Sequence, residues 1–239
     1  MIAVVLGVVL SSRGGSGGGP VVSTSDLQGL PATGSATWEG ALQGAPDANS
    51  LFKGIPQNGL VLGDPKAPVT MEMFIDVQCP ICQEYEVSNL PTVVKDDIAN
   101  GKVQLHLKPW AFIGDQSVTG RYGIIAAAKQ NKGFEYTKVL YDNQPPDSEN
   151  TGYLTGKWMA QIAASVDGLD LAKWKTDVNS SATKATAHGV DTLAAQKKVS
   201  GTPTVLVGCT GGKLQDVTTP SAAPTLQETQ LAINAADCS

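Results

Sequence analysis

Two cysteines separated by two residues are the feature of this sequence most able to do chemistry. Cys79-Pro80-Ile81-Cys82 follows an apolar run and begins a stretch with helical spacing. A helix N-terminus stabilises a thiolate through its unsatisfied amides and its dipole, and a second sulfur one turn inside can close a ring. The thiolate is the form that attacks a disulfide. We therefore expect redox exchange, with Cys79 as the attacking thiol and Cys82 as the resolving thiol.

A CxxC pair is also half of many zinc sites. Such a site needs further ligands, typically a second CxxC or two histidines at short spacing. The remaining cysteines, Cys209 and Cys238, are far apart in the chain, and the histidines, His106 and His188, fall in unrelated elements. The spacing therefore predicts no metal site, and we expect both histidines to be ordinary surface or packed residues.

The elements around the CxxC motif predict a strand, a helix and a second strand. Residues 69–77 form an apolar, branched-rich run that suits a buried strand. Residues 79–99 carry apolar side chains at roughly helical spacing, and Pro91 predicts a kink within them. Residues 102–110 alternate apolar and polar side chains, which is the signature of a strand. One crossover unit thus places Cys79 at the end of a buried strand.

A helical block separates this unit from a second set of strands. Helical spacing recurs in segments separated by turns: 117–131, 134–143, 154–165, 171–179 and 181–198. Residues 204–207 and 213–217 then predict a hairpin, and residues 225–236 predict a final helix with Thr225 as its N-cap. The predicted order is βαβ, a helical block, then ββα.

A second signal, Thr202-Pro203, stands directly before this hairpin. Proline at the first residue of a strand blocks one ladder hydrogen bond. Together, residues 74–82 (FIDVQCPIC) and 201–207 (GTPTVLV), on either side of a helical block, resemble the bacterial DsbA-like thiol:disulfide oxidoreductases of the thioredoxin superfamily. The resemblance covers residues 52–238, and the pairing of both motifs is much more specific than CxxC alone.

The resemblance implies an α/β thioredoxin fold with a central mixed sheet and an inserted α-helical domain, to which composition adds a flexible N-terminal tether. The core would comprise residues 51–116 and 199–239, and the helical insertion residues 117–198. Pro203 would be the family's cis-proline facing the dithiol. Thr202 would pair through its backbone with an extended substrate, while its hydroxyl contacts the active-site sulfur. Pro80 and Ile81 would complete the substrate-facing motif. No cofactor is expected beyond the redox-active disulfide of Cys79 and Cys82.

The sequence departs from the family pattern in two places. Many relatives carry an acidic residue six positions before the first cysteine, which assists proton transfer at the buried second thiol, and Met73 stands there. Glu72 should face the other side of the strand, so we expect water or Asp76 to substitute. The dipeptide between the cysteines lacks the histidine of the strongest oxidants. We therefore expect a milder oxidant, with the pKa of Cys79 lowered mainly by the helix terminus.

The second cysteine pair is expected to be structural. Cys209 ends the strand after Pro203, and Cys238 follows the final helix. A ββα unit folds that helix back over the hairpin, and an even cysteine count fits an exported protein. We expect a disulfide between them. The alternatives are two free thiols, or an electron relay with the CxxC pair.

Composition bounds the remaining possibilities. The chain has 239 residues, which favours one compact domain. Its net charge of -5 and its lack of a run of basic residues exclude the basic surface that binds a nucleic-acid backbone. Residues 1–50 are rich in glycine and poor in charge, and we expect a disordered linker. The alternative is that Trp38, the one large apolar group among them, docks onto the folded domain and places the boundary before residue 50. Residues 1–10 are apolar but short of the roughly 20 residues that cross a bilayer. They are either part of a longer membrane or signal segment, or a disordered tail.

These observations predict an extracytoplasmic thiol:disulfide oxidoreductase, tethered to the membrane or secreted. Its substrates would be unfolded exported proteins, and the resemblance implies a membrane quinone-linked partner that reoxidises the dithiol. Alternatives on the same fold are a disulfide reductase or isomerase, and a redox-silent chaperone or binding module. Nucleic acid is not an expected partner. A monomer is expected, because no separate dimerisation segment is present in the sequence.

Overall fold

The computed structural model describes residues 21–218 and 223–238, and within them the centre of the molecule is a six-stranded mixed sheet. The strand order is β1-β2-β4-β3-β5-β6. β3 and β4 are parallel, with Val69 opposite Val103, and the other neighbouring strands are antiparallel. The strands are β1 (Gln57–Asn58), β2 (Val61–Leu62), β3 (Val69–Ile75), β4 (Val103–Pro109), β5 (Thr204–Cys209) and β6 (Gln215–Asp216).

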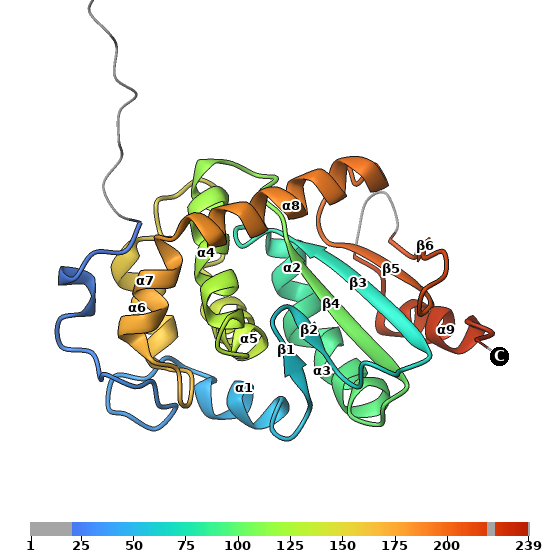
Figure 1. The fold of residues 1–239 in the computed structure, drawn as a ribbon, viewed down its shortest axis with the longest axis horizontal. Helices are drawn as coiled ribbons and strands as arrows, with labels where there is room; N and C mark the ends of the chain where they lie inside the picture. The colour runs from blue at the N-terminus through green and yellow to red at the C-terminus, as the bar shows by residue number, and fades with distance from the viewer. Residues whose placement is uncertain (1–20, 219–222, 239) are drawn as a thin grey trace, which may run out of the picture.

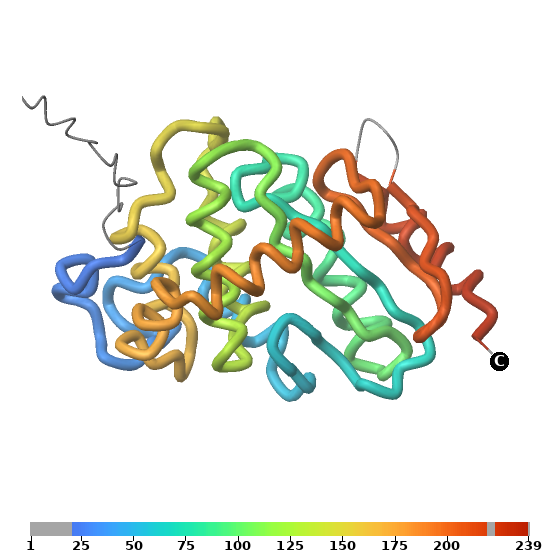
Figure 2. The backbone as a smooth tube through the Cα atoms, turned by 45° about the horizontal axis from the view of Figure 1, so that its top comes forward, coloured from blue at the N-terminus to red at the C-terminus, as the bar shows by residue number. Residues whose placement is uncertain are grey.

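Strand alternation divides the core between the two faces of this sheet. Met73 of β3 points into the main core, and the adjacent Phe74 points to the opposite face. Phe74 packs there against Val190 and Ala194 of α8 (Ser181–Lys197). Figure 2 shows this long helix crossing from the helical part of the molecule to the sheet. The predicted central β3 is fully buried, as its apolar run requires.

The crossover between β3 and β4 is one helical stretch in which α-helical and π-helical segments alternate. It consists of α2 (Pro80–Glu84), the π-helical η2 (Tyr85–Asn89), α3 (Leu90–Val93) and the π-helical η3 (Val94–Ile98). Pro91 has no amide hydrogen and cannot continue a regular ladder. The π-helical η2 directly before it accommodates the missing hydrogen bond. The kink expected at Pro91 is therefore present as a π-helical segment.

The helical insertion lies beside the sheet (Figure 1). It contains α4 (Asp115–Ala128), α5 (Gly133–Asp142), α6 (Gly156–Ala164), α7 (Leu171–Val178) and most of α8. Its core is aromatic: Trp174 and Tyr136 are fully buried, with ring centroids 5.9 Å apart. Side-chain oxygens of Thr155, Asp170 and Ser180 cap three of the helices at the positions where the predicted segments begin. The α/β fold with a central mixed sheet and an inserted helical domain is therefore confirmed.

The expectation of a disordered linker up to residue 50 does not hold for residues 21–50. This segment contains the short helices η1 (Ser25–Leu27) and α1 (Ala45–Leu51) and packs against the insertion. Val22 is 1% exposed. The side-chain amide of Asn179 accepts a hydrogen bond from the backbone N–H of Val21 and donates one to the backbone carbonyl of Val22. Gly34 approaches the carbonyl oxygen of Val166 so closely that a Cβ would collide with it. Small residues here allow close backbone packing, which composition alone does not distinguish from a linker.

Residues 1–20, including the apolar run 1–10, lie outside the described residues. Among the helices that are described, none has the length and apolar character needed to cross a membrane.

Candidate functional site

Cys79 lies at the N-terminus of α2, directly after the loop that leaves β3. Its Sγ occupies the capping position and accepts a hydrogen bond from the backbone N–H of Cys82 at 3.3 Å. The same thiol donates to the carbonyl oxygen of Thr202 at 3.3 Å. Cys79 is 5% exposed, whereas Cys82 is completely buried. Both thiols are free, and Cys79 is the one that solvent and a substrate can reach.

The two cysteine thiols differ in pKa because their surroundings differ. The pKa of Cys79 is lowered to about 7, chiefly by a hydrogen bond from the Cys82 thiol, against the opposing effect of burial. The Thr202 hydroxyl and the backbone amides of Cys82 and Ile81 lower it further. Burial raises the pKa of Cys82 well above its usual range, and the neighbouring Cys79 raises it again. Near neutral pH the pair therefore holds one thiolate, on Cys79, and one proton, on Cys82.

Thr202 and Pro203 close the site from the opposite side, more than 100 residues away in the chain. The Thr202–Pro203 peptide bond is cis, and Pro203 is buried. The Thr202 hydroxyl oxygen is buried and has no hydrogen-bond partner in the described part of the chain, so it can turn toward either sulfur. β5 pairs with β3 in antiparallel register, and this pairing carries Thr202 to the N-terminus of α2. The structure thus brings the predicted motif residues together.

Asp76 anchors the loop before Cys79, and this differs from its expected role in proton handling. Its two carboxylate oxygens accept from the backbone N–H groups of Gln78, Phe112 and Ile113 at 2.8, 2.6 and 2.8 Å. They also accept from the hydroxyl of Ser117 at 2.6 Å. Four donors occupy this fully buried carboxylate. We conclude that Asp76 joins the β3–α2 loop to the β4–α4 loop.

The same loop is held by three hydroxyl groups of the helical insertion, which sequence reasoning missed. They bond successive backbone carbonyls: Tyr141 to Asp76 at 2.8 Å, Tyr153 to Val77 at 2.6 Å, and Ser148 to Gln78 at 2.6 Å. Tyr141 and Ser148 are buried. We call these three residues the hydroxyl clamp. No local sequence pattern predicts it, because its two sides are about 65 to 76 residues apart.

The position of the missing family acid is apolar. Met73 is fully buried in the main core. Glu72 lies on the opposite face of β3, where its carboxylate pairs with Lys197 at 3.0 Å and Lys108 at 3.7 Å. Strand alternation therefore separates Glu72 from the dithiol, as expected.

The two histidines lie outside the site. His106 is on β4, where its Nε2 pairs with Gln104 Oε1 at 3.0 Å, and burial lowers its pKa. His188 is exposed on α8. In the described part of the chain, no three His, Cys, Asp or Glu side chains are grouped to hold a metal ion.

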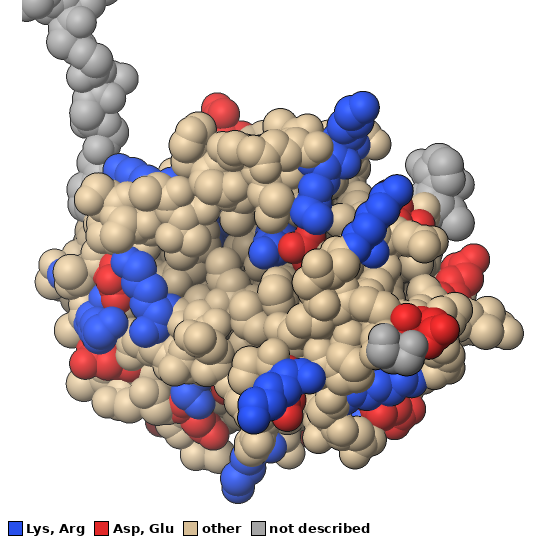
Figure 3. Space-filling view, turned by 45° about the vertical axis from the view of Figure 1, so that its right-hand side comes forward, with Lys and Arg blue, Asp and Glu red and all other residues tan. Residues whose placement is uncertain are grey.

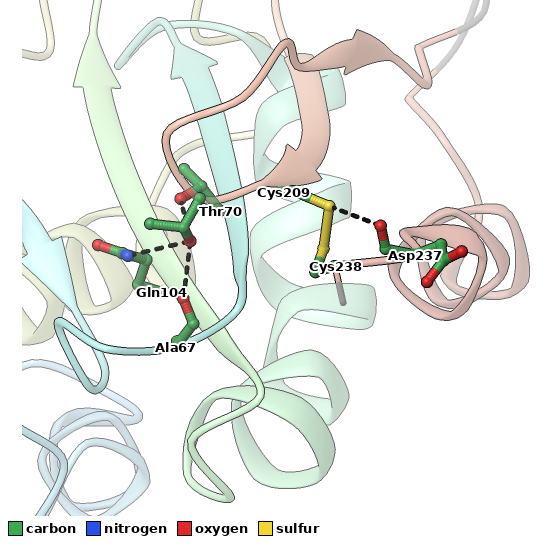
Figure 4. The surroundings of a disulfide bond; sticks show 7 residues. Ala67, Thr70, Gln104, Cys209, Asp237 and Cys238 are labelled. Atoms are coloured by element: carbon green, nitrogen blue, oxygen red, sulfur yellow. Dashed lines mark hydrogen bonds between the residues drawn. A yellow bond between two sulfur atoms is a disulfide. The ribbon is translucent and has the colours of Figure 1, made fainter.

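Cys209 and Cys238 form a disulfide that ties the end of β5 to the chain after α9 (Leu226–Ala235), as Figure 4 shows. Their Cα atoms are 5.3 Å apart. The dithiol lies at the other end of β5, where Thr204 begins the strand. Five residues of strand span roughly 17 Å at about 3.4 Å per residue. At that separation the two pairs are not in contact, which argues against an electron relay between them.

Apolar side chains are exposed around the dithiol. Of the five large hydrophobic side chains exposed in the described residues, four lie on the α2–η2 helix, on the loop after β4 or at the start of α4: Ile81, Val87, Phe112 and Val118. Trp110 stacks near Phe112, with ring centroids 5.0 Å apart. A cavity of about 680 Å³ lies elsewhere, lined by residues of α1, β1 and α5, and the predicted site residues do not line it. The dithiol thus faces an open apolar surface.

Acidic and basic side chains are interspersed on the face drawn in Figure 3. Several lysines stand beside carboxylates, such as Lys102 with Asp97 and Lys197 with Glu72. This pattern and the net charge of -5 give no basic stripe for a phosphate backbone on that face.

A family model described as Thioredoxin matches residues 56–222. Two curated relatives, each named "Probable disulfide bond formation protein D", come from Bacillus cereus and Bacillus anthracis. They are 32% and 30% identical over 162 residues, which cover 66% of this chain and 73% of each relative.

Solved structures share the fold. Oxidised BdbD from Bacillus subtilis has a TM-score of 0.63 at 21% identity, covering 74% of this chain and 91% of that one. Chlamydia trachomatis DsbA has a TM-score of 0.61 at 19% identity, covering 75% and 91%.

Proposed function

This chain belongs to the thioredoxin family as a DsbA-like thiol:disulfide oxidoreductase, and we propose that it introduces or exchanges disulfides in exported proteins through Cys79 and Cys82. One observation carries the assignment of these residues. The accessible sulfur caps a helix and bonds the carbonyl of the residue before a cis-proline, while its partner sulfur is buried one turn inside. A reactive thiolate and a protected resolving thiol are the two parts that exchange requires.

The proposed cycle begins with the oxidised Cys79–Cys82 pair. A substrate thiolate attacks Cys79 Sγ, the S–S bond breaks, and Cys82 leaves as a thiolate that takes up a proton. The second substrate thiolate then attacks the substrate sulfur of the mixed disulfide, and Cys79 leaves as a stabilised thiolate. The substrate loses two electrons, which the dithiol holds. Cys79 is the sulfur attacked because Cys82 is completely buried.

The exposed apolar residues around the dithiol support a preference for unfolded protein segments. Ile81, Phe112 and Val118 are 39%, 50% and 36% exposed, and grouped exposed apolar side chains mark interaction sites more than single ones do. An extended segment would lay its own apolar side chains on this surface while its backbone pairs with Thr202. Apolar contacts are non-directional, which suits an enzyme with many substrates.

The cellular setting is also part of the proposal. The Cys209–Cys238 disulfide fits an oxidising compartment outside the cytoplasm. Residues 1–20 directly precede Val21, whose backbone is hydrogen-bonded to Asn179 of the helical insertion. We propose that residues 1–20 tether the domain at the membrane. A membrane quinone-linked partner would then reoxidise the Cys79–Cys82 dithiol without any further cofactor. We propose a monomer with no nucleic-acid partner.

The direction of exchange depends on the reduction potential of the pair. Known potentials run from about −270 mV for thioredoxin to about −120 mV for DsbA. We expect a value between them, above about −230 mV, because Cys79 has a lowered pKa but lacks a histidine in its motif. Equilibration with glutathione buffers measures it. A value at or below that of thioredoxin would favour the reductase alternative.

Refolding of a reduced, unfolded disulfide protein tests the function itself. We expect the oxidised wild type to restore activity to the substrate and Cys79→Ser to lose this ability. The matched control is the double variant Cys209→Ser/Cys238→Ser, which removes two cysteines outside the site and should keep the activity. Equal refolding by wild type and Cys79→Ser would support the redox-silent binding module instead.

A further inference from the structure

Residues 144–150, in the chain between α5 and α6, are fastened to the residue that precedes Cys79. That residue, Gln78, is completely buried. Its carbonyl oxygen accepts a hydrogen bond from the hydroxyl of Ser148 at 2.6 Å, and its side-chain Oε1 accepts one from the backbone N–H of Asn150 at 2.8 Å. We call residues 144–150 the rim loop. One end of the rim loop is therefore fixed beside the reactive cysteine.

The residue after Cys82 holds the other end of the rim loop. The side-chain Nε2 of Gln83 donates to the carbonyl oxygens of Tyr141 and Gln144 at 2.8 and 3.0 Å. Gln144 is 5% exposed and begins the rim loop. Glutamines on both sides of the CxxC motif thus bind the rim loop at its two ends, which makes the loop part of the surroundings of the dithiol.

Two carboxylate side chains of the rim loop are exposed. Ser148 is buried, whereas its neighbours Asp147 and Glu149 are exposed. Consecutive Cα atoms are about 3.8 Å apart, so the hydrogen bond from Ser148 to Gln78 places the backbone of both residues within roughly 12 Å of that of Cys79. In the part of the chain that the structure describes, neither carboxylate takes part in an ion pair. Their charges are therefore available to a substrate.

A third exposed carboxylate lies on the loop that follows β4. The hydroxyl of Ser117 accepts a hydrogen bond from the side-chain Nε2 of Gln78 at 2.7 Å. Asp115, two residues earlier, is exposed at the first position of α4. In the sequence it stands between Phe112 and Val118, two of the exposed apolar side chains around the dithiol. The surface around the dithiol therefore carries acidic as well as apolar side chains.

The segments that carry this surface have no basic residues to balance the carboxylates. Residues 78–94, 109–120, 139–156 and 199–212 contain no Lys, Arg or His. Three cations that adjoin these segments are paired with carboxylates of their own: Lys108 with Glu72, Arg121 with Asp191 and Lys138 with Asp142. A surface with this balance attracts a basic segment and repels an acidic one.

We propose that the surface around the dithiol selects extended substrate segments that combine apolar side chains with Lys or Arg near the reacting cysteine. Asp147 and Glu149 are its specificity-determining residues. This inference rests on the proposed function of the Cys79–Cys82 pair. The apolar side chains of the segment cover exposed residues such as Phe112, while its cations lie beside the rim loop. The redox step is that of the proposed cycle, in which the substrate dithiol loses two electrons to the Cys79–Cys82 disulfide.

Charge has two separable effects on such a reaction. Opposite charges raise the rate of encounter within a Debye length, which shrinks from about 30 Å at 0.01 M salt to about 3 Å at 1 M. A cation beside a cysteine also lowers the pKa of that thiol and so raises its thiolate fraction. A comparison of substrates must therefore correct for the thiolate fraction before it reports attraction to the protein.

Three peptides that differ only in charge test the proposal. Each carries two cysteines and the same apolar residues, with two lysines, two glutamines or two glutamates beside the first cysteine. Quenched-flow alkylation gives the second-order rate constant for oxidation of each peptide by the oxidised protein, corrected for its thiolate fraction. At about 0.01 M salt, wild type should oxidise the lysine peptide at least about tenfold faster than the glutamate peptide. At about 1 M salt, the two rate constants should agree within about twofold.

Substitutions in the rim loop test which residues carry the preference. Asp147→Asn/Glu149→Gln should reduce the low-salt preference at least about threefold, and Asp147→Lys/Glu149→Lys should reverse it. The rate constant for the glutamine peptide should stay within about twofold of wild type in both variants, because that peptide has no charge to attract. A merely structural effect would change all three rate constants together. The matched control is Glu39→Gln/Asp96→Asn, which makes the same change in net charge at exposed positions outside these segments and should keep the preference.

The outcomes separate this inference from the proposed function. Equal rate constants for the lysine and glutamate peptides in wild type at low salt would overturn the inference. So would a preference that Asp147→Asn/Glu149→Gln leaves unchanged, or one that the control variant loses to the same extent, since net charge would then explain it. If wild type oxidises none of the three peptides, the proposed function fails instead.

Discussion

The hydroxyl of Tyr141 donates to the backbone carbonyl of Asp76 at 2.8 Å, and this bond joins helix α5 of the insertion to the loop that carries Cys79. The same carbonyl accepts the backbone N–H of Cys79 at 2.9 Å. One carbonyl oxygen therefore links the position of the reactive cysteine to the inserted domain. The insertion contributes to the site by fixing the backbone from which α2 begins.

Removing this hydroxyl should loosen the loop without unfolding the protein. We expect Tyr141→Phe to lower the free energy of unfolding by about 1–3 kcal/mol, because a buried carbonyl loses a partner. Hydrogen exchange of the Cys79 amide should become faster than in wild type. Tyr122→Phe removes a hydroxyl from the neighbouring helix α4 and is the control. Unchanged exchange at Cys79 in Tyr141→Phe would show that the clamp does not hold the loop.

The acidity of Cys79 should be visible as a thiolate titration in the reduced protein. Absorbance at 240 nm should rise with a midpoint near pH 7, and Cys82 should not titrate in the same range. Thr202→Val should raise the midpoint, because the hydroxyl that lowers the pKa is lost, whereas Thr202→Ser should preserve it. A midpoint above 8.5, the usual value for a free cysteine, would contradict this account of the site.

The buried Glu86 should make stability fall as pH rises. Its pKa is raised from 4.5 to about 8 on folding, so its stabilising contribution is complete below about 4.5 and is lost as pH rises toward 8. Between these values the loss is about 1.4 kcal/mol per pH unit. Glu86→Gln should therefore gain stability relative to wild type from pH 5 to pH 8 in urea unfolding. Parallel pH dependences in the two proteins would show that Glu86 is not neutral in the fold.

The Cys209–Cys238 disulfide should stabilise the protein without taking part in exchange. Removing a bridge that closes a loop of this size costs roughly 3–4 kcal/mol on the chain-entropy model. Cys209→Ser/Cys238→Ser should lose about this much in denaturant unfolding, while the reduction potential of the Cys79–Cys82 pair stays within error of wild type. A changed reduction potential would support an electron relay between the Cys209–Cys238 disulfide and the Cys79–Cys82 pair.

Asp76 should be more sensitive to substitution than its neighbours. Asp76→Ala leaves four donors without their acceptor, three of them backbone N–H groups. We expect a loss of roughly 2–5 kcal/mol, since hydrogen bonds to charged groups contribute about 1.5–3 kcal/mol each and do not add fully. Glu84→Ala, on the surface of α2, is the control and should stay within about 0.5 kcal/mol of wild type. A small loss in Asp76→Ala would mean that the two loops hold their positions independently.

Periodicity and capping predict most of the fold. The apolar run in residues 69–77 and the alternation in residues 102–110 locate β3 and β4, and Thr225 forms the expected cap, as part of a capping box with Glu228. Alternation also separates Glu72 from the dithiol correctly. These features depend on neighbours along the chain, so local patterns are sufficient to find them.

Features that depend on distant partners could not be predicted in this way. Residues 21–50 have linker composition, but Asn179 and the backbone of residues 164–169 order them. Asp76 gains its role from donors in residues 112–117, and the hydroxyl clamp comes from the insertion. Glu86 is buried where α5 packs against η2, a contact that no local pattern predicts. In each case tertiary packing decides what the residue does.

Trapping the reaction intermediate tests the central claim, exchange at Cys79 with Cys82 as the resolving thiol, most directly. Cys82→Ser, activated as a mixed disulfide and incubated with a reduced peptide that carries a single cysteine, should retain the peptide on Cys79, because neither Cys82 nor a second peptide thiol can resolve the bond. Mass mapping without reduction identifies the linked cysteine, and Cys79→Ser is the matched control. The account predicts a peptide adduct on Cys79 alone. An adduct on Cys209 or Cys238, or an equal adduct on Cys82 in Cys79→Ser, would contradict it.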